Sequence, residues 1–222
     1  MTVTPVAPAT PASPGTSTTP APSASLAPLT ERLAAGETYR PRTLDTLRIA
    51  DKDLRLVLEG RRHLLFDGGM GTMLQAAGMA AGEVPELLNL TNPEVITRVH
   101  TAYVEAGSEV ITTNTFGANA LKLGDAASVE DVFTAAVQAA RAAHPRYVAA
   151  DIGPIGALLR PLGTLSFDEA YALFAQQACV AEQAGADLIV IETMTDLLEV
   201  KAAVLAAKGC TNLPVIATMT FE

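Results

Sequence analysis

The stretch AGADLIVIETM (residues 184–194) has a near copy earlier in the chain, AGSEVITTNTF (residues 106–116). Each copy reads as the end of a helix, an acidic residue, a short apolar strand and a polar residue at the strand exit. The repeating unit is therefore a helix followed by a strand, and this order predicts a parallel sheet. The apolar runs do not alternate with polar residues, which is typical of strands covered on both faces.

The same alternation of helical segments and apolar strands extends along the chain from about Thr43 onward. Amphipathic helical patterns separate the apolar runs. Several of these patterns begin with Asn, Ser or Asp, which can cap a first turn, and three end at Gly. Strands are predicted at 63–67, 109–114, 146–151, 187–192 and 214–221, and helices at 92–107, 128–143, 166–185 and 196–209.

The spacing of these units leaves two α/β architectures open. Strand exits fall at Asp67, Asn114, Asp151 and Glu192, about 40 residues apart, whereas a closed barrel of eight such units takes about 250 residues or more. Only about 175 residues carry the pattern here, and they supply five strands. We expect either an open doubly wound sheet or a (β/α)8 barrel of the TIM type that is truncated after about five parallel strands.

Composition divides the chain into a tail and one globular domain. Of the 222 residues, 49 % are hydrophobic and 18 % are charged, which suits a single domain with a sizeable core. In contrast, 24 of the first 30 residues are Ala, Pro, Ser or Thr, and none has a charged side chain. Such a segment buries too little surface to offset its lost chain entropy. We expect a disordered tail over residues 1–45 and a domain over residues 46–222.

Charge and cysteine content narrow the classes of function. The 15 basic and 24 acidic residues give a net charge of -9, the wrong sign for binding a phosphate backbone, so nucleic acid is excluded as a partner. No apolar stretch approaches the ~20 residues that cross a bilayer, so we expect no membrane contact and a cytoplasmic location. The two cysteines, Cys179 and Cys210, lie far apart and indicate neither a disulfide framework nor a complete metal site.

Each predicted strand ends in a polar residue, the last of them in Thr218 or Thr220. Because the carboxyl ends of parallel strands face the active site in α/β folds, these side chains should gather at one rim. Asp, Asn and Thr also cap helices that follow strands, and for Asp151 and the threonines this structural interpretation stays open. Glu192 indicates a site more strongly, because glutamate is a poor cap and follows a buried run directly.

The sequence DGGMGT at residues 67–72 invites comparison with a dinucleotide-binding loop, but it lacks the G-x-G-x-x-G spacing. An acid at the strand exit would also repel a pyrophosphate. Asp67 and Glu192 on one rim could instead hold an ammonium group, and the glycine amides could receive a carboxylate, which together suit an amino acid. The alternative is that Asp67 only ties down its own turn.

Five segments resemble a known family: LLFDGGMGTMLQ, PELLNLTNPEVITRVHTAYVEAGSEVITTNTFGAN, DIGPIG, AGADLIVIETM and LPVIATMTF. They are similar, in order and at matching spacing, to the homocysteine S-methyltransferase family, and most of all to the homocysteine-binding modules of its cobalamin-dependent methionine synthases. The resemblance covers about residues 53–222 and leaves out the tail.

This resemblance implies a (β/α)8 barrel that binds homocysteine at the carboxyl ends of its strands. In the family, a zinc ion held by three cysteines takes the substrate sulfur and lowers the pKa of the thiol, so that a thiolate attacks a methyl group. Cobalamin carries that methyl group in the cobalamin-dependent members, and methyltetrahydrofolate replenishes it on separate modules. By motif match, Asp67 and Glu192 would orient the amino group, Gly68, Gly69, Gly71 and Thr72 would form the loop around it, and Asn114 would line the rim.

The cysteines depart from the family pattern. The zinc ligands of the family lie in an Asn-Cys pair after the sixth strand and in a Gly-Gly-Cys-Cys motif after the eighth, and neither motif occurs here. Cys179 and Cys210 match neither position. We therefore expect no zinc site and no catalytic residue in this chain, which would be a piece of a longer reading frame and inactive alone.

Two other functions stay open. The chain could be a non-catalytic amino-acid-binding or assembly module. Separately from the choice of function, a remnant of five strands would have exposed sheet edges, which favour self-association. A Schiff-base aldolase is the weaker alternative, because none of the lysines, Lys52, Lys122, Lys201 and Lys208, lies on a predicted strand.

Overall fold

The structure is a computed structural model, and it describes residues 42–80 and 82–221. Most of the expected tail, residues 1–41, lies outside the described residues. The last four residues of that expected tail, 42–45, are described, and Leu44–Thr46 forms the short 3-10 helix η1. Within the described ranges, no helix has both the length and the apolar character needed to cross a bilayer.

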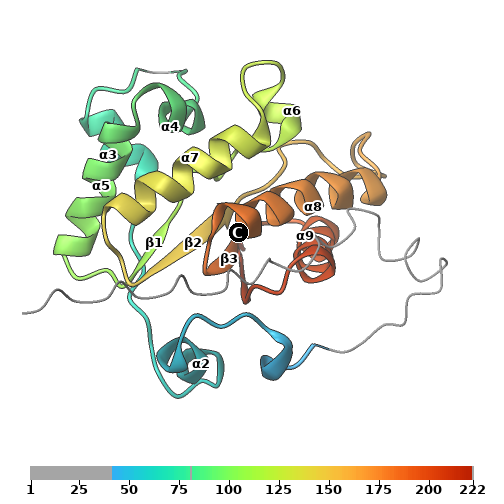
Figure 1. The fold of residues 1–222 in the computed structure, drawn as a ribbon. Helices are drawn as coiled ribbons and strands as arrows, with labels where there is room; N and C mark the ends of the chain where they lie inside the picture. Colours follow the sequence, from blue (N-terminus) through green and yellow to red (C-terminus); the bar gives the residue numbers. More distant parts are fainter. Residues whose placement is uncertain (1–41, 81, 222) are drawn as a thin grey trace, which may run out of the picture.

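A parallel sheet forms the centre of the molecule (Figure 1). Its four strands are β1 (Val110–Thr112), β2 (Tyr147–Ile152), β3 (Leu188–Met194) and β4 (Val215–Met219), and they lie side by side in the order of the sequence. The parallel α/β class predicted from the repeated helix and strand unit is thus confirmed.

The predicted strand at residues 63–67 differs from the other four. Only one residue, Phe66, forms a parallel bridge, with Val110 of β1. The backbone amide of Asp67 donates to the carbonyl of Val110 over 3.1 Å, so the segment still runs beside β1. Among the described residues the sheet therefore has four strands and one flanking bridge, rather than the five strands that we expected.

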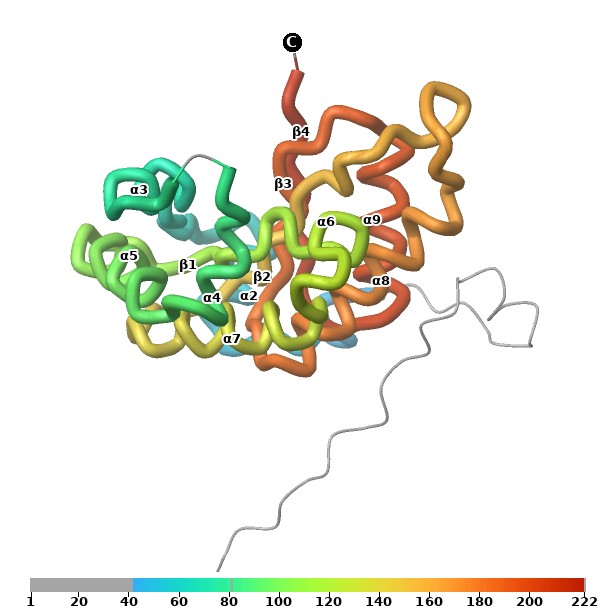
Figure 2. The backbone as a smooth tube through the Cα atoms, turned by 90° about the horizontal axis from the view of Figure 1, so that it is seen from above, coloured from blue at the N-terminus to red at the C-terminus, as the bar shows by residue number. Residues whose placement is uncertain are grey.

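The four predicted helices are present, and they cover one face of the sheet. They are α5 (Pro93–Glu105), α7 (Val129–Ala142), α8 (Phe167–Ala184) and α9 (Leu197–Cys210). Figure 2 shows them following one another around the outside of the strands. Ser128, Ser166 and Asp196 cap three of these helices through their side chains, as predicted. Asn92 makes no such cap hydrogen bond, and α5 starts instead with Pro93 at its first position.

Besides η1, five shorter helices were not predicted. They are α2 (Lys52–Leu58), α3 (Met70–Ala76), α4 (Leu88–Thr91), α6 (Ala120–Leu123) and the 3-10 helix η2 (Pro85–Leu87). Each is too short to show a clear helical period in the sequence. Two of them, α3 and η2, contribute residues to the wall of the cavity described below.

The period of two along each strand gives the sheet two different faces. Outward-facing residues such as Val148, Ala150 and Ile152 belong to the main core beneath the helices. Their inward-facing neighbours Tyr147 and Ala149 belong to a second core, together with Val110, Leu188, Val190 and Leu54 of α2. The inner face is thus apolar near the amino ends of the strands.

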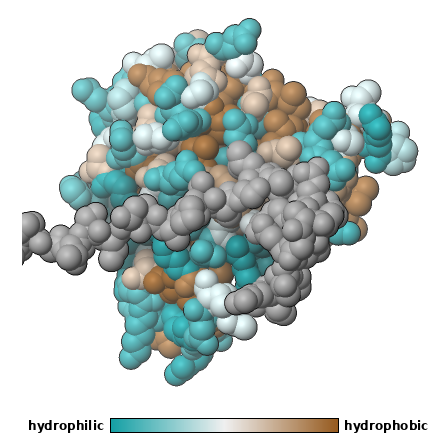
Figure 3. Space-filling model, turned by 45° about the vertical axis from the view of Figure 1, so that its right-hand side comes forward, coloured by the Kyte–Doolittle hydropathy of each residue, from teal (hydrophilic) through white to brown (hydrophobic). Residues whose placement is uncertain are grey.

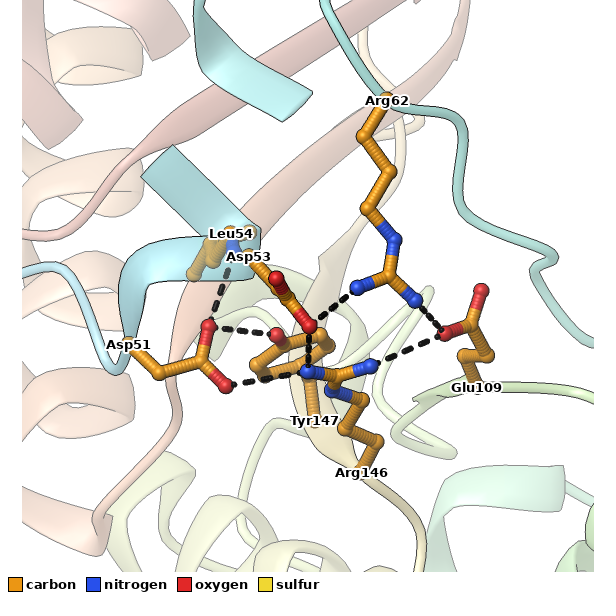
Figure 4. A network of polar contacts seen from close by, with 7 residues as sticks. All are labelled: Asp51, Asp53, Leu54, Arg62, Glu109, Arg146 and Tyr147. Atoms are coloured by element: carbon orange, nitrogen blue, oxygen red, sulfur yellow. Dashed lines mark hydrogen bonds and ion pairs between the residues drawn. The ribbon is translucent and has the colours of Figure 1, made fainter. Parts of the chain in front are cut away.

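Helix α2 closes the inner face at the amino ends of the strands, where an ion-pair network holds it (Figure 4). Tyr147 donates from its hydroxyl to Asp51 over 2.7 Å, and Arg146 contacts both Asp51 and Glu109 at 3.4 Å. Asp53 also pairs with Arg62 and Arg146. The amino ends of the strands are thus covered on the inner face, and the cavity described below lies at their carboxyl ends.

Candidate functional site

A cavity of about 590 Å³ lies at the carboxyl ends of the strands, a volume within the range of small-molecule sites. Its wall combines strand residues, the segment around Asp67 and the start of η2. The lining residues are Phe66, Asp67, Gly68, Gly69, Met70, Gly71, Pro85, Glu86, Thr112, Thr113, Asn114, Phe116, Asp151, Val190, Glu192, Ile216 and Thr218.

The inward-facing strand positions change character along the sheet. Ala149, Val190 and Ile216, deeper on the inner face, are apolar, and two positions later in the same strands Asp151, Glu192 and Thr218 are polar. One alternation therefore produces both the apolar floor and the polar rim of the cavity. The structure brings together, in the lining of this cavity, the residues that the sequence placed at strand exits: Asp67, Asn114, Asp151, Glu192 and Thr218.

Asp67 is fixed to the neighbouring strand. Its carboxylate accepts hydrogen bonds from the backbone amide of Thr112, at 3.1 and 3.0 Å, and from the Thr112 hydroxyl at 2.9 Å. These contacts run across to β1, so Asp67 does more than stabilise its own turn. Burial raises the pKa of Asp67 to about 6, and the nearby charge of Glu192 adds to the rise.

Glu192 lies inside β3, which continues to Met194, whereas we expected the strand to end at Glu192. The pairing of β3 with β4 is irregular between Ile191 and Met194, and Thr193 has a φ of 60°, which β-branched residues rarely adopt. The Thr193 amide donates to the hydroxyl of Thr218 over 3.2 Å. Irregular strand positions often accompany functional sites because they redirect a side chain, and this one accompanies the half-buried Glu192.

Four carboxyl groups line the cavity: those of Asp67, Glu86, Asp151 and Glu192. Its described lining residues include no Lys, Arg or His. Burial raises the pKa of Glu192, and burial together with the charges of Glu192, Asp67 and Glu86 raises the pKa of Asp151 well above its ordinary value. A cavity with this excess of acidic groups favours a ligand that brings positive charge.

The glycine segment is shorter than predicted, because helix α3 begins at Met70. Gly68 and Gly69 form the loop, while Gly71 lines the cavity from the first turn of α3. A β-carbon on Gly68 would lie 3.0 Å from the hydroxyl of Tyr103, so this position favours glycine. Thr72 differs from the expectation that it forms the loop around the ligand. It is exposed and does not line the cavity, because its hydroxyl donates to the carbonyl of Gly69 at 3.2 Å.

Asn114 lines the cavity and also holds its wall together. Its side-chain amide donates to the carbonyl of Pro85 over 2.7 Å, and its own carbonyl accepts from the side chain of Asn89 over 2.7 Å. These bonds tie the end of β1 to η2 and α4. Asn114 is therefore present at the predicted rim, but its side-chain amide is already hydrogen-bonded to the carbonyl of Pro85.

Two carboxylates of the site were not chosen from the sequence. Glu86 is 7 % exposed, and it accepts a 2.6 Å hydrogen bond from the amide of Gly117. An acid within the apolar run VPELL was the available signal for it. Asp151 was noticed at a strand exit, but helix capping explained it equally well; the structure places it in the cavity instead.

The described residues do not fit the zinc ion of the family. Cys179 and Cys210 are both buried between α8 and α9, where the sulfur of Cys179 lies 3.9 Å from the carbonyl of Cys210, and neither lines the cavity. Across residues 42–80 and 82–221, no group of three or more His, Cys, Asp or Glu side chains has the geometry to hold a metal ion.

Comparisons with known proteins agree with the geometry. A family model described as homocysteine S-methyltransferase matches residues 64–222. The methionine synthases of Mycobacterium tuberculosis (strain ATCC 25618 / H37Rv) and Mycobacterium leprae (strain TN) are 35 % and 34 % identical over 194 residues. Each match covers 78 % of this chain and 16 % of the relative, so the chain spans about a sixth of the length of these relatives.

Solved structures of the homocysteine methyltransferase MmuM from Escherichia coli are similar in fold. The apo form has a TM-score of 0.61 and 25 % sequence identity, over 77 % of this chain and 64 % of that chain. The metallated form has a TM-score of 0.61 and 26 % identity, over 77 % of this chain and 66 % of that chain. The four parallel strands with their outer helices thus correspond to part of a (β/α) barrel.

Proposed function

The chain belongs to the homocysteine S-methyltransferase family, and on that premise we propose that its cavity binds homocysteine as the acceptor of a methyl group. The observation that carries this proposal is the gathering of four carboxyl groups in one cavity whose described lining has no basic residue. An amino acid brings the missing positive charge on its ammonium group.

In the proposed complex, Asp67 and Glu192 receive the ammonium group. Both line the cavity, from the segment before α3 and from β3. Their charges act on each other, which supports a shared ligand between them. The backbone of Gly68, Gly69 and Gly71 offers small, close-approach positions for the carboxylate of the ligand, while Thr72 supports this loop from outside.

The remaining wall suits the methylene and sulfur end of homocysteine. Phe66, Phe116, Val190 and Ile216 contribute apolar surface to the same cavity. Burying a methylene group against such surface contributes about 0.8 kcal/mol. The ligand would thus lie with its charged end at the acidic rim and its thiol against apolar side chains.

We further propose that this chain binds homocysteine without methylating it. Activation of the thiol in the family depends on zinc, and the described residues provide no ligand set for that ion. The methyl donor, including cobalamin and methyltetrahydrofolate, would be supplied outside the described residues. Zinc bound in a one-to-one ratio by the purified chain, or methionine formed by it, would contradict this part of the proposal.

A second candidate function is a non-catalytic amino-acid-binding or assembly module. The specific observation in its favour is that the groups suited to an amino acid are present while a metal ligand set is absent from the described residues. A reconstitution experiment distinguishes the two candidate functions. Methionine formation that requires this chain together with the rest of a methionine synthase supports the methyltransferase function.

The direct test of binding is calorimetry with homocysteine on the full chain and on two isosteric variants, Asp67→Asn and Glu192→Gln. Each variant removes one charge-assisted hydrogen bond, which contributes about 1.5–3 kcal/mol, so we expect affinity to fall about 10- to 100-fold. Glu130→Gln, at an exposed position on α7, is the matched control and should bind like the wild type. Unchanged affinity in both cavity variants would refute the proposed site.

A further inference from the structure

The carboxyl group of Asp151 stands out from the other three in the cavity. Asp151 ends the inward-facing row of β2 and is only 6 % exposed. Its backbone is fixed by the hydroxyls of two threonines: Thr113 accepts from its amide at 3.1 Å, and Thr115 donates to its carbonyl at 2.7 Å. The side chain therefore has a defined position in the cavity wall, yet its Oδ1 atom is buried with no hydrogen-bond partner.

The charged groups that face Asp151 are all acidic. They are Glu192 from β3, Asp67 from the segment before α3 and Glu86 from η2. Asp67 is bonded to Thr112 and Glu86 to the amide of Gly117, so these two carboxylates have partners of their own.

No basic side chain among the described lining residues balances the charge of the Asp151 carboxyl group. Lys122 of α6 directs its ammonium group to the carbonyl of Pro154 at 3.0 Å and lies outside the cavity lining. A buried carboxylate that has one unpartnered oxygen and three acidic neighbours is costly, and the usual outcome is that the group keeps its proton. The raised pKa of Asp151 agrees with this expectation.

We propose that Asp151 carries a proton in the ligand-free cavity and releases it when the ammonium group of an amino acid enters. The proposal rests on the proposed function, because it takes homocysteine as the ligand. The exchange balances: the O–H bond of Asp151 breaks, the proton leaves to solvent through the cavity mouth, and one ammonium charge takes its place. Among the four carboxyl groups the ammonium charge replaces the charge of the proton, and the unpartnered oxygen gains a partner, while the carboxylate of the ligand lies at the glycine loop.

This exchange makes binding depend on pH. Between the pKa of Asp151 in the complex and its pKa in the free cavity, each bound ammonium group displaces one proton, so affinity should rise by about tenfold per pH unit. A ligand without a positive charge cannot displace the proton and gains nothing from this site. Asp151 would thus act as a specificity-determining residue that selects amino acids carrying a charged ammonium group.

The test is calorimetry of homocysteine binding in two buffers with different heats of protonation, at neutral to mildly alkaline pH, where Asp67 is ionised. The difference in heat counts the protons released. We expect about one proton per bound homocysteine for the wild type and none from this group in Asp151→Asn. The homocysteine thiol also carries a proton, and the comparison with Asp151→Asn isolates the contribution of the carboxyl group.

Glu199→Gln is the matched control. Glu199 is also 6 % exposed and has a raised pKa, but it accepts a 2.7 Å hydrogen bond from the amide of Ile155 and lies outside the cavity lining. This variant should release the same number of protons as the wild type. Equal proton release in the wild type and Asp151→Asn, or none in the wild type, would overturn the inference while leaving homocysteine binding intact.

A wild-type chain that does not bind homocysteine at all would overturn both the proposed function and this inference. Should Asp151→Asn fail to fold, carbon-13 spectra of aspartate carboxyl groups in the wild type give the answer. One aspartate should stay protonated through neutral pH in the free chain and ionise when homocysteine is added. Complete ionisation of every aspartate below neutral pH in the free chain would contradict the proposal.

Discussion

Asp67 combines two properties that oppose each other. Its carboxylate is anchored by Thr112, and those hydrogen bonds favour the ionised form, yet burial and the charge of Glu192 raise its pKa to about 6. The raised value means that ionised Asp67 costs folding free energy when no ligand is present. A residue kept in this state at the mouth of a cavity is typical of a site whose ligand supplies the compensating charge.

The pH dependence of stability tests this property of Asp67. The folded pKa of about 6 lies above the ordinary value of 3.8, so the folded state holds the proton more tightly than the unfolded state. Stability from this group is therefore present below the ordinary pKa and falls as the pH rises through about 6. Asp67→Asn should remove this decline.

At neutral pH we expect Asp67→Asn to stabilise the chain by about 1–2 kcal/mol, after allowance for solvent screening of a half-buried group. This corresponds to a rise in Tm of about 2–4 °C for each kcal/mol. Thermal unfolding of both proteins between acidic and neutral pH gives the measurement. A variant that is less stable than the wild type at neutral pH would contradict the assignment of Asp67 as a strained, ligand-directed carboxylate.

Single residues of the site were predictable where the sequence isolates them. Asp67 and Glu192 each follow an apolar run directly, and both lie in the cavity. Glu86 was not predictable, because its burial depends on a hydrogen bond to Gly117, 31 positions away in the chain. Thr72 was misplaced for a local reason: the loop ends at Gly69, and the helix that starts at Met70 turns the Thr72 hydroxyl back toward the loop.

Strands and long helices were predictable to within about three residues, because each has enough length to show its period. The predicted helix at 128–143 is α7, Val129–Ala142, and the predicted strand at 146–151 is β2, Tyr147–Ile152. The segment 63–67 has the apolar character of a strand but contributes one bridge. The irregular pairing near Thr193 depends on the register between β3 and β4, which cannot be predicted from the local sequence.

The outer edge of β4 is the exposed element of the sheet. β4 pairs with β3 on one side, and no strand among the described residues pairs with its other side. Ala217 and Thr218 are exposed, and Phe221, two residues past the strand, is 82 % exposed. Figure 3 shows hydrophobic patches between hydrophilic side chains on one face of the molecule. An unpaired edge of this kind is a template for pairing with another chain.

We expect the purified chain to self-associate through this edge as its concentration rises. Ala217→Lys places a charge on the exposed strand and should shift the chain toward monomer, because edge charges oppose strand pairing. Ala102→Lys adds the same charge on the exposed side of α5 and is the control. Size-exclusion chromatography with light scattering measures both. A wild type that stays monomeric at all concentrations, or equal behaviour of the two variants, would contradict the prediction.

At the scale of the whole molecule, the two ends of the parallel strands differ: their amino ends are closed and their carboxyl ends are open. Helix α2 and its ion-pair network close the amino ends of the strands (Figure 4), while the acidic cavity opens at the carboxyl ends. The sequence left an open sheet and a barrel as alternatives, because strand order and curvature are not local properties. The strand order, the helices on one outer side and the likeness to homocysteine methyltransferases together favour part of a barrel.

The central claim is that the carboxylates of Asp67 and Glu192 together receive one ammonium group in this cavity. The most direct test compares the affinity of the full chain for homocysteine with its affinity for 4-mercaptobutyrate, which lacks only the amino group. We predict that homocysteine binds at least about tenfold more tightly. This preference should vanish in the double variant Asp67→Asn, Glu192→Gln. Equal affinities in the wild type, or a preference that survives in the double variant, would contradict the claim.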